Sequence, residues 1–326
     1  MRIAFVYDIR ENVLGVTNSD TLRELTTEFF TPNEANAIIR ELKALGHEIV
    51  VLDGLQGFRQ TLSSRAFDFD LVFNEAKGLY GPERKLYLPA LCDVHEIKYV
   101  GSTGYVVSLA RNKWHSRAVA AQAGVAVAPG MFVNSLTELD RHWSNYPAFV
   151  KPNFESASIG ISKNSLVRSL EELEKQTAQL LQRFPEGILV EAFVTGREMQ
   201  VSLLGNRSPR ALPPAEVTII GNSCMGDRFI TNEAWGRESV EFHPCSDDGL
   251  RVRLKEAAIK IYRACGLRHY GRVDFRVPED GQPVFIEVAT HPHITPGSSM
   301  VASASWAGMT HGNLLDTLLC EALAVG

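Results

Sequence analysis

Cysteine is scarce in this sequence, and its pattern argues against a disulfide framework. Five cysteines are scattered along 326 residues without a CxxC pair. Such an odd, unspaced set favours reduced thiols in a cytoplasmic protein over a zinc site. No apolar run approaches the length of a membrane span, and the apolar stretch at the N-terminus is too short for a signal peptide.

The sequence also lacks a block of like charges. Its formal net charge of −5 provides no basic field for grasping nucleic acid, so nucleic acid is not an expected partner. What is present is ordinary: 45% of the residues are hydrophobic and 22% are charged. This composition and length predict a globular chain of two or three domains with substantial cores.

The first third of the sequence alternates between strand and helix patterns. Apolar runs predict strands at 3–7, 47–52 and 70–73, and an amphipathic pattern predicts a helix over 32–45. This order predicts a parallel sheet with helices on both faces. A glycine-rich turn at 101–104 marks the expected end of this domain.

The remainder of the chain mixes the two patterns. It is expected to contain helices at 113–123, 169–183, 250–265 and 313–323, a strand at 148–152 and an irregular stretch at 206–246. A further region is expected to begin with a strand at Ile188. We therefore expect an α/β protein divided into units of 1–101, 102–187 and 188–326.

Two short apolar strands near the C-terminal end each carry one carboxylate. Asp274 and Glu287 occupy positions where they could face each other on neighbouring antiparallel strands. Mg²⁺ takes oxygen ligands and usually bridges carboxylates to nucleotide phosphates. Arg272 has the same side-chain parity as Asp274 and could stabilise oxyanion charge in a transition state. The pattern is also typical of a β-hairpin with solvated charges.

Two lysines and a loop are further candidates for the functional site. Lys151 ends a strand beside Pro152, and Lys113 lies near a helix start. The loop at 155–160 is small and hydroxyl-rich, so its backbone N–H groups could cover phosphate oxygens. It matches neither a Walker loop nor a dinucleotide fingerprint. Each feature alone is also typical of a surface lysine or a plain turn.

A segment at 191–198 places two acids around an apolar turn. Its backbone could meet an adenine edge, while Glu191 and Glu198 accept hydrogen bonds from an amine and from ribose hydroxyls. The plain alternative is a strand, a turn and a surface glutamate.

Taken together and in order, these motifs resemble the ATP-grasp superfamily, and within it the D-alanine–D-alanine ligase group. The resemblance covers the chain from about Phe67 and is looser before it. It implies a three-domain α/β ATP-grasp fold, with an N-terminal parallel α/β domain and ATP held between two α+β domains. It also implies an ADP-forming ligase that joins a small-molecule carboxylate to an amine through an acyl phosphate. ATP and Mg²⁺, with Mn²⁺ as a possible substitute, are the implied cofactors, and a homodimer is favoured.

The resemblance assigns roles to individual positions. Arg272 and Ser158 match catalytic residues, and Asp274 and Glu287 match magnesium ligands. The matching nucleotide-binding residues are Lys113, Lys151, Glu155, Ser156, Glu191, Ala192, Phe193, Val194 and Glu198. The candidate substrate residues are Glu34, His293, Ser298 and Ser299.

Several positions depart from the family pattern. Ala289 stands where the family has an asparagine metal ligand, so one Mg²⁺ is expected to be held less fully unless water or Thr290 fills the gap. His293 replaces a glycine, and Ala157 replaces the first serine of a serine pair. His291 and His293 form a pair with no third ligand, which favours a structural or substrate-contacting role over a transition-metal site.

The substrate side departs furthest. The glycine-rich start motif is absent, which leaves Glu34 as the candidate amine-binding acid. The expected mobile loop at 222–238 lacks the usual lysine and tyrosine and offers Arg228, Trp235 and Arg237 instead. We therefore expect a ligase that uses ATP in the family manner on a different substrate pair.

Four functions fit these departures. The first is an amino-acid or dipeptide ligase of unspecified substrates, related to D-alanine–D-alanine ligase. The second is a natural-product ligase of the mycosporine type, which joins an amino acid to a cyclohexenone. The others are a true D-alanine–D-alanine ligase and an ATP-binding protein whose catalysis has decayed, although the retained Arg272, Asp274 and Glu287 speak against decay.

Overall fold

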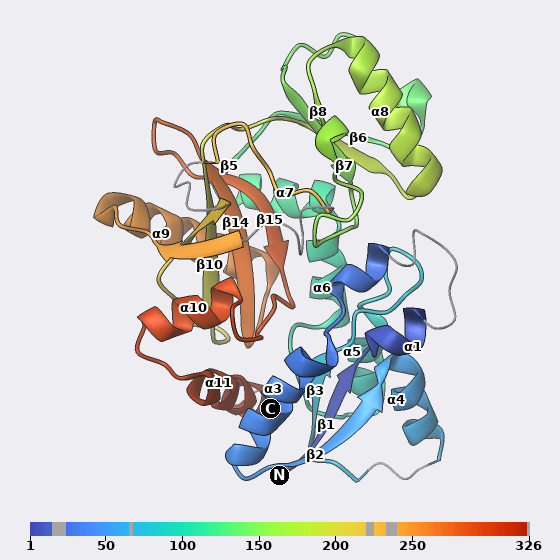
Figure 1. Ribbon diagram of the computed structural model, residues 1–326, viewed down its shortest axis with the longest axis vertical. Helices are drawn as coiled ribbons and strands as arrows, with labels where there is room; N and C mark the ends of the chain where they lie inside the picture. Colours follow the sequence, from blue (N-terminus) through green and yellow to red (C-terminus); the bar gives the residue numbers. More distant parts are fainter. Residues whose placement is uncertain (15–23, 65–67, 220–224, 233–239, 325–326) are drawn as a thin grey trace.

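Three β-sheets with packed helices make up the computed structural model (Figure 1). The structure describes residues 1–14, 24–64, 68–219, 225–232 and 240–324. Among these residues, no helix combines the length and apolar character needed to cross a membrane.

The N-terminal sheet has the order β2-β1-β3-β4 and is parallel throughout. Side chains of β1 alternate between its faces, with Phe5 packing beside α3 and Val6 packing beside α4. The predicted parallel sheet with helices on both faces is therefore confirmed. Its elements are β1 (Arg2–Tyr7), α1 (Arg10–Leu14), a 3-10 turn η1 (Thr26–Glu28), α3 (Pro32–Ala44), β2 (Glu48–Asp53), α4 (Gly54–Ser63), β3 (Leu71–Glu75), α5 (Tyr87–Val94) and β4 (Tyr99–Val100).

The middle sheet is antiparallel and has the order β6-β9-β7-β8. Its strands are β6 (Gly130–Val133), β7 (Ala148–Pro152), β8 (Leu166–Val167) and β9 (Ile188–Ala192), with short turns η2 (Leu136–Glu138) and η3 (Lys163–Ser165). Helix α8 (Leu170–Arg183) places Leu173 and Leu180 in the core shared with these strands. Because β9 pairs with β6 and β7, the segment Ile188–Ala192 belongs to this sheet.

The C-terminal sheet has the order β13-β12-β10-β14-β15-β5, with β11 paired to β10. It contains β5 (Ala126–Val127), β10 (Arg197–Leu204), β11 (Arg210–Ala211), β12 (Ala215–Ile219), β13 (Val240–Pro244), β14 (Tyr270–Val277) and β15 (Val284–Ala289). The helices α6 (Gly104–Arg111), α7 (Lys113–Gln122) and α9 (Asp248–Cys265) contribute to its core.

The prediction of an irregular stretch at 206–246 was wrong, because this segment contains β11, β12 and β13. All of β12 is buried, so its alternation of side chains does not appear as a polar and apolar pattern. Strand β13 lies at the sheet edge and is largely exposed, so it lacks the apolar signal of a buried strand.

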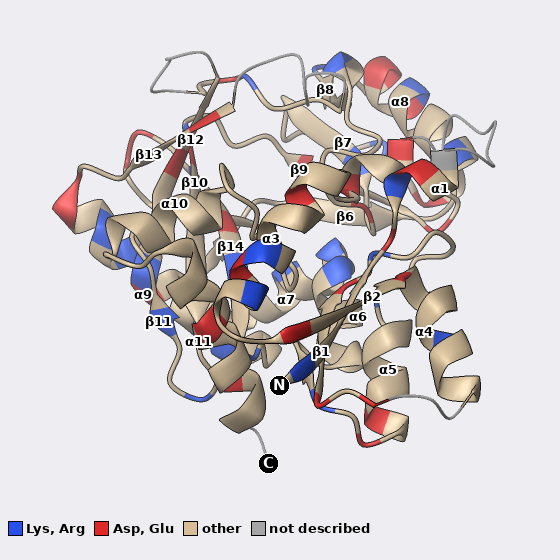
Figure 2. Ribbon diagram, turned by 60° about the horizontal axis from the view of Figure 1, so that its bottom comes forward, with Lys and Arg blue, Asp and Glu red and all other residues tan. Residues whose placement is uncertain are grey.

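The chain ends on the unit where it began. Helices α10 (Ser299–Trp306) and α11 (His311–Ala324) follow the last strand, and α11 lies beside α3 in Figure 1. Leu314 and Leu318 of α11 share a core with Ile38 of α3, so the last helix packs on the N-terminal unit. Figure 2 shows acidic and basic residues on α8, whereas most of the charged residues on α9 are Lys or Arg.

Candidate active site

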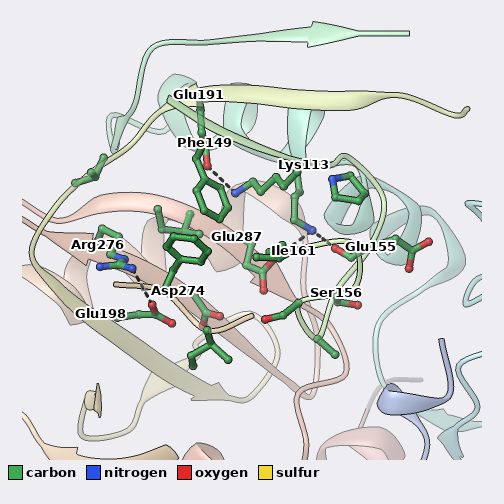
Figure 3. Close-up of a pocket in the computed structure, with 18 of the residues that line it drawn as sticks. Lys113, Phe149, Glu155, Ser156, Ile161, Glu191, Glu198, Asp274, Arg276 and Glu287 are labelled. Atoms are coloured by element: carbon green, nitrogen blue, oxygen red, sulfur yellow. Dashed lines mark hydrogen bonds and ion pairs between the residues drawn. The ribbon is translucent and has the colours of Figure 1, made fainter. Parts of the chain in front are cut away.

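One pocket collects every residue expected to act in catalysis, nucleotide binding or metal binding (Figure 3). Its walls come from the middle sheet, the C-terminal sheet and the loop after β7. The predicted residues lining it are Lys113, Lys151, Glu155, Ser156, Ser158, Glu191, Ala192, Phe193, Val194, Glu198, Arg272, Asp274 and Glu287. Their individual roles stay predictions, but their convergence is a property of the fold.

The carboxylate pair lies on two neighbouring strands. Asp274 of β14 is the direct register partner of Glu287 of β15, with a bulge following Asp274, so the predicted facing arrangement is confirmed. Arg272 donates two hydrogen bonds of 2.7 Å to the two oxygens of Asp274. A planar guanidinium fits a carboxylate in this bidentate way.

Burial and neighbouring charges separate these two acids. Burial raises the pKa of Asp274 to about 6, although Arg272 opposes the shift. Burial also acts to raise the pKa of Glu287, but Lys113, Lys151 and Arg272 hold it below its usual value. One acid is therefore poised near neutrality while the other stays ionised.

These carboxylates are a chemically suitable but incomplete set of magnesium ligands. Among the described residues, no group of three or more His, Cys, Asp or Glu side chains could hold a metal ion. Two carboxylates suffice for Mg²⁺ when water and phosphate oxygens complete its shell. Ala289 pairs in register with Arg272 and offers no ligand atom, and the Thr290 hydroxyl contacts Nδ1 of His291 at 3.0 Å.

The two lysines are buried at the pocket wall rather than exposed. Lys151 of β7 lies 2.6 Å from Oε1 of Glu191 on β9. Lys113 is the first residue of α7, and its Nζ lies 3.2 Å from Oε2 of Glu287 and donates to the carbonyl of Glu155. Each amine is thus held by an acid or carbonyl that an incoming phosphate could replace.

The turn between β9 and β10 forms an aromatic end of the pocket. The ring of Phe149 lies 5.7 Å from that of Phe193 and 4.8 Å from that of Phe229, the latter edge-on. Arg276 lies over the Phe193 ring at 5.3 Å and pairs with Glu198 at 3.4 Å. This end could take a flat heteroaromatic base.

Sequence reasoning missed Phe229 and Arg276. Arg276 follows Arg272 and Asp274 with the same parity on β14, so strand alternation alone could have identified it. Phe229 lies in a short described segment outside any strand, and no local pattern points to it.

The loop after β7 has an unusual backbone. Ala157 and Ser158 both adopt left-handed conformations, with φ of 51° and 56°. Such residues are strained unless their surroundings fix them. The loop is fixed at its end by Gly160, whose N–H donates to Glu24 at 2.8 Å, and by the buried Ile159.

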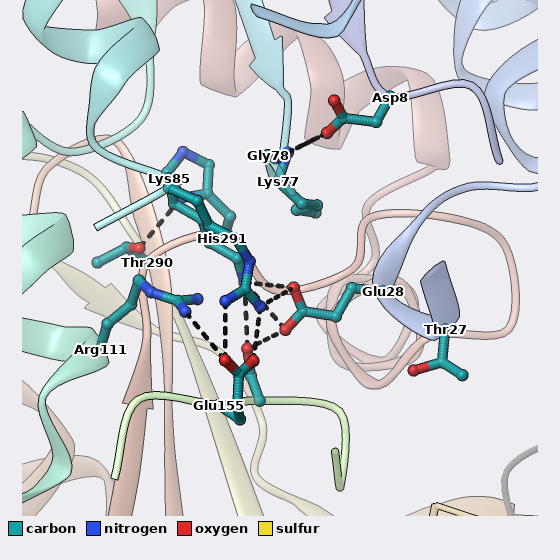
Figure 4. Close-up of polar contacts among 12 residues, drawn as sticks. Asp8, Thr27, Glu28, Lys77, Gly78, Lys85, Arg111, Glu155, Thr290 and His291 are labelled. Carbon is teal, nitrogen blue, oxygen red and sulfur yellow. Dashed lines mark hydrogen bonds and ion pairs between the residues drawn. The ribbon is translucent and has the colours of Figure 1, made fainter. Parts of the chain in front are cut away.

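Glu155 lines the pocket, and its carboxylate also joins a buried charge cluster. We use this name for Glu28, Arg84, Lys85, Arg111 and Glu155 (Figure 4). Arg84 donates to both oxygens of Glu155, at 2.8 and 2.6 Å. Lys85 lies 3.0 Å from Glu28 and 3.1 Å from the Ser156 hydroxyl, which donates to Glu28.

The cations dominate this cluster electrostatically. Burial acts to raise the pKa of Glu28, yet Lys85, Arg84 and Arg111 hold it well below its usual range. Burial lowers the pKa of Lys85 to about 7, with Glu28 opposing the shift and Arg111 reinforcing it. Sequence reasoning missed the cluster because its members come from four separate segments and each looks like an ordinary solvated charge.

The four candidate substrate residues are not among those lining the pocket. Glu34 instead closes the capping box of α3, accepting from the N–H and hydroxyl of Thr31 at 2.8 Å. Ser298 caps α10, and Ser299 is buried in its first turn. Glu24 and Glu28, rather than Glu34, contact the loop after β7.

His293 lies near the cluster in an aromatic setting. Its ring is 5.6 Å from that of Phe30, and burial, reinforced by Lys77 and Arg272, lowers its pKa to about 3. Of the expected mobile loop, Asn222, Trp235 and Arg237 lie outside the described residues. Arg228 is described, and its carbonyl accepts from Arg276 at 2.6 Å.

Comparison with known proteins places this arrangement in context. Residues 120–320 match the family model described as "D-ala D-ala ligase C-terminus". A D-alanine–D-alanine ligase of Halalkalibacterium halodurans is 31% identical over 301 residues, covering 88% of this chain and 92% of that relative. An uncharacterized protein of Sinorhizobium fredii is 28% identical over 295 residues, covering 87% and 86%.

Solved structures share the fold. The D-alanine–D-alanine ligase from Bacillus anthracis complexed with ATP superposes with a TM-score of 0.75 at 21% identity, covering 100% of this chain and 98% of that chain. The VanG D-Ala:D-Ser ligase from Enterococcus faecalis gives a TM-score of 0.74 at 18% identity, covering 98% and 99%. The expected ATP-grasp architecture is therefore confirmed.

Proposed function

The chain belongs to the D-alanine–D-alanine ligase family of ATP-grasp, ADP-forming C–N ligases, and we propose that it uses ATP and Mg²⁺ to join a carboxylic acid to an amine. The two substrates are a pair other than two molecules of D-alanine. The convergence of Lys113, Lys151 and Arg272 around two facing carboxylates carries this proposal. Such a site can hold a nucleotide triphosphate and stabilise charge on a transferring phosphoryl group.

The chemistry would proceed in two balanced steps. A carboxylate oxygen of the acid forms a bond to the γ-phosphorus of ATP, while the bond from that phosphorus to ADP breaks. The amine nitrogen then forms a bond to the acyl carbon, phosphate leaves, and one proton passes to solvent. Both steps develop negative charge on oxygens that cations must neutralise.

The residues of this chain divide that work. Lys151 and Lys113 would contact phosphate oxygens, and the N–H groups of the loop at 155–160 would cover the γ-phosphate. Asp274 and Glu287 would hold Mg²⁺, which when bound neutralises and orients phosphate oxygens. Arg272, fixed by Asp274, would stabilise the oxyanion formed when the amine attacks.

The nucleotide base would occupy the aromatic end of the pocket. Phe149, Phe193 and Phe229 offer ring contacts there, while Glu191 and Glu198 supply acceptors. The acid and the amine would then lie away from the rings, near Ser156 (Figure 3) and near Arg272, which also lines the pocket.

The altered substrate pair is supported by the buried charge cluster. Glu28, the acid beside the phosphate loop, is already bound by Lys85, Arg84 and Ser156. No contact among the described residues singles out a cyclohexenone, so a mycosporine-type substrate is not carried further. A homodimer stays a prediction from the family resemblance.

Phosphate release tests the proposal directly. The protein would be incubated with ATP, Mg²⁺ and a panel of acids and amines, singly and in pairs, and both ADP and the amide product would be measured. We expect release that depends on a particular acid–amine pair, with one ADP formed per amide. ATP binding without release for any pair would contradict the ligase assignment.

A further inference from the structure

Glu24 connects the N-terminal part of the chain to the middle unit at the end of the loop after β7. One carboxylate oxygen, Oε1, accepts from the N–H of Gly160 at 2.8 Å. The other, Oε2, pairs with Arg183, the last residue of α8. The side chain of Glu24 is 17% exposed, so both contacts are largely shielded from solvent. A single carboxylate therefore ties the loop and the end of α8 to the segment that precedes η1.

The loop backbone is tightly packed at the point that Glu24 contacts. Gly160 has a left-handed conformation, with φ of 75°, and a Cβ atom there would lie 2.5 Å from Pro152 and 2.8 Å from the ring of Phe184. Only glycine fits such a position. Arg183 lies over the same Phe184 ring at 5.1 Å. Gly160 is thus held through its N–H by Glu24 and through packing by Phe184.

The residues that follow Glu24 contact other parts of the same loop. Glu28 accepts from the hydroxyl of Ser156 at the start of the loop. Leu25 is buried in the core that contains Ile159, near the end of the loop. Residues 24–28, which we call the supporting segment, therefore hold the loop after β7 at both ends.

The loop needs support from outside because its middle is strained. Ala157 and Ser158 both have left-handed backbones, which persist only where the surroundings fix them. Inside the loop, the N–H of Ile159 donates to the carbonyl of Ser156 at 3.0 Å. Such an internal turn shapes the loop but does not fix its place over the pocket. Contacts to other segments, such as that of Glu24, fix its place.

An ordered loop matters most for the γ-phosphate of ATP. Under the proposed function, on which this step rests, backbone N–H groups of the loop cover that phosphate. Such groups bind phosphate well when they are already ordered, because binding then costs less conformational entropy. ADP lacks the γ-phosphate, so its binding depends far less on the loop. Contacts that order the loop should therefore favour ATP over ADP.

We infer that Glu24 is a positioning residue that holds the phosphate-covering loop in place through Gly160 and Arg183. Glu24 is not among the residues that line the pocket, so it acts through the loop rather than by touching the nucleotide. Its removal should weaken the binding of a nucleotide triphosphate selectively.

Two substitutions of Glu24 test this inference. Glu24→Leu removes the acceptor for the Gly160 N–H, whereas Glu24→Gln keeps a carbonyl oxygen in its place. Each protein would be titrated by calorimetry, in the presence of Mg²⁺, with ADP and with the non-hydrolysable ATP analogue adenylyl imidodiphosphate. We expect Glu24→Leu to raise the Kd of the analogue about tenfold, as the loss of one hydrogen bond to a charged acceptor allows. The Kd of ADP should stay within about twofold, and Glu24→Gln should recover most of the affinity for the analogue.

Hydrogen exchange provides a second readout that does not depend on nucleotide. Backbone amides at 155–161 should exchange faster in Glu24→Leu than in the wild type, while those of α8 should be unchanged. The paired change Glu24→Leu with Arg183→Leu leaves no unpaired arginine, so it serves if the single variant fails to fold, and it should show the same selective loss. Glu174→Leu is the matched control, because Glu174 also lies in the middle unit, on α8, and pairs with exposed Arg141 at 2.9 Å. It should change neither Kd.

The outcomes separate this inference from the proposed function. Equal weakening of the analogue and of ADP in Glu24→Leu would show a general structural role and overturn the inference, as would unchanged affinity for both. An equal loss in Glu24→Gln would also overturn it, because the acceptor for Gly160 would then not matter. Failure of the wild type to bind either nucleotide would instead refute the proposed function.

Discussion

The two ends of the active-site pocket are built in different ways. At the nucleotide end, Lys151 pairs with Glu191 and Arg272 with Asp274, both within the predicted set, while Glu198 pairs with Arg276 of the neighbouring strand. At the substrate end, Arg84 and Lys85 reach across to Glu28 and Glu155 from distant segments. The residues predicted to bind the nucleotide thus lie in local strand motifs, whereas the buried charge cluster is assembled from separate segments of the chain.

This difference has an energetic consequence. Pairs at the nucleotide end involve lysines and carboxylates that could exchange their partners for phosphate oxygens or a cation. Pairs in the buried charge cluster are largely shielded from water, so removing one member leaves an uncompensated charge. The Lys151–Glu191 pair is shielded as well, so variants at either end need a stability measurement beside the activity measurement.

The largest expected effect is at Arg272. Replacing it by Met should lower turnover by roughly 10²–10³-fold, because a preorganised donor to the developing oxyanion is lost. Nucleotide affinity should change by less than about threefold, since Lys113 and Lys151 remain. Single-turnover kinetics and calorimetric binding of an ATP analogue would measure the two quantities separately.

Asp274 complicates this experiment, because Arg272 is its partner. Arg272→Lys keeps a cation beside Asp274 but loses the bidentate geometry, so it controls for stability. Arg251→Gln controls for surface charge, because Arg251 pairs only with exposed Asp248 and the carbonyl of Cys245. Equal losses of turnover and nucleotide affinity in Arg272→Met would remove Arg272 from its assigned role.

The next largest effect is expected at Lys151. Lys151→Met should weaken nucleotide binding and also destabilise the fold by about 3–5 kcal/mol, because Glu191 is left buried without its partner. Adding Glu191→Gln should restore most of the stability but not the binding. Chemical denaturation and nucleotide titration of both variants would check this, and recovery of binding in the double variant would contradict it.

The fold was largely readable from the sequence where elements are amphipathic or bounded by turn residues. The helix α3 shows this well, since Thr31, Pro32 and Glu34 mark its start and Gly46 follows its end. The strands β12 and β13 were missed because one is wholly buried and the other lies exposed at the sheet edge. Neither environment produces the period-two pattern on which strand prediction depends.

The site was predictable to the extent that its residues share strands or loops. The pair Asp274 and Glu287 follows from strand parity and hairpin register alone. Glu28 and Arg84 could not be found in this way, since they are brought together only by the packing of η1 against the segment before α5. The prediction for Glu34 met the same limit, because the sequence does not show that its carboxylate also caps α3.

The stability of the protein should depend on pH through Lys85 of the buried charge cluster, and the expected effect is of moderate size. Burial lowers the folded-state pKa of Lys85 to about 7, below its ordinary value of 10.5, so the unfolded chain binds its proton more tightly. Stability should therefore rise with pH between about 7 and 10.5, at up to about 1.4 kcal/mol per pH unit from this group. The contribution is fully present above the unfolded pKa and is lost as pH falls through the folded pKa.

The measurement is a difference between two denaturation series. Free energies of unfolding of the wild type and of Lys85→Met would be compared from pH 7 to pH 10, which cancels other titrating groups. Glu28, Arg84, Arg111 and Lys77 face the amine and are present in both proteins. If the unfolding free energies of the two proteins changed in parallel with pH, Lys85 would keep an ordinary pKa. The cluster would then be less positive than its geometry implies.

The smallest effect is expected at Glu34, and it bears directly on the contrast between the two ends of the pocket. Because its carboxylate caps α3, Glu34→Ala should cost about 1 kcal/mol of stability while leaving the KM values of both substrates within about twofold. Glu28→Ala should instead change substrate KM strongly. Glu34→Gln, which retains an acceptor for the Thr31 N–H, should recover most of the lost stability. If Glu34→Ala raised the substrate KM as much as Glu28→Ala did, this prediction would be contradicted. Glu34 would then belong to the substrate site, and the acid that recognises the amine would lie in the local motif at the start of α3.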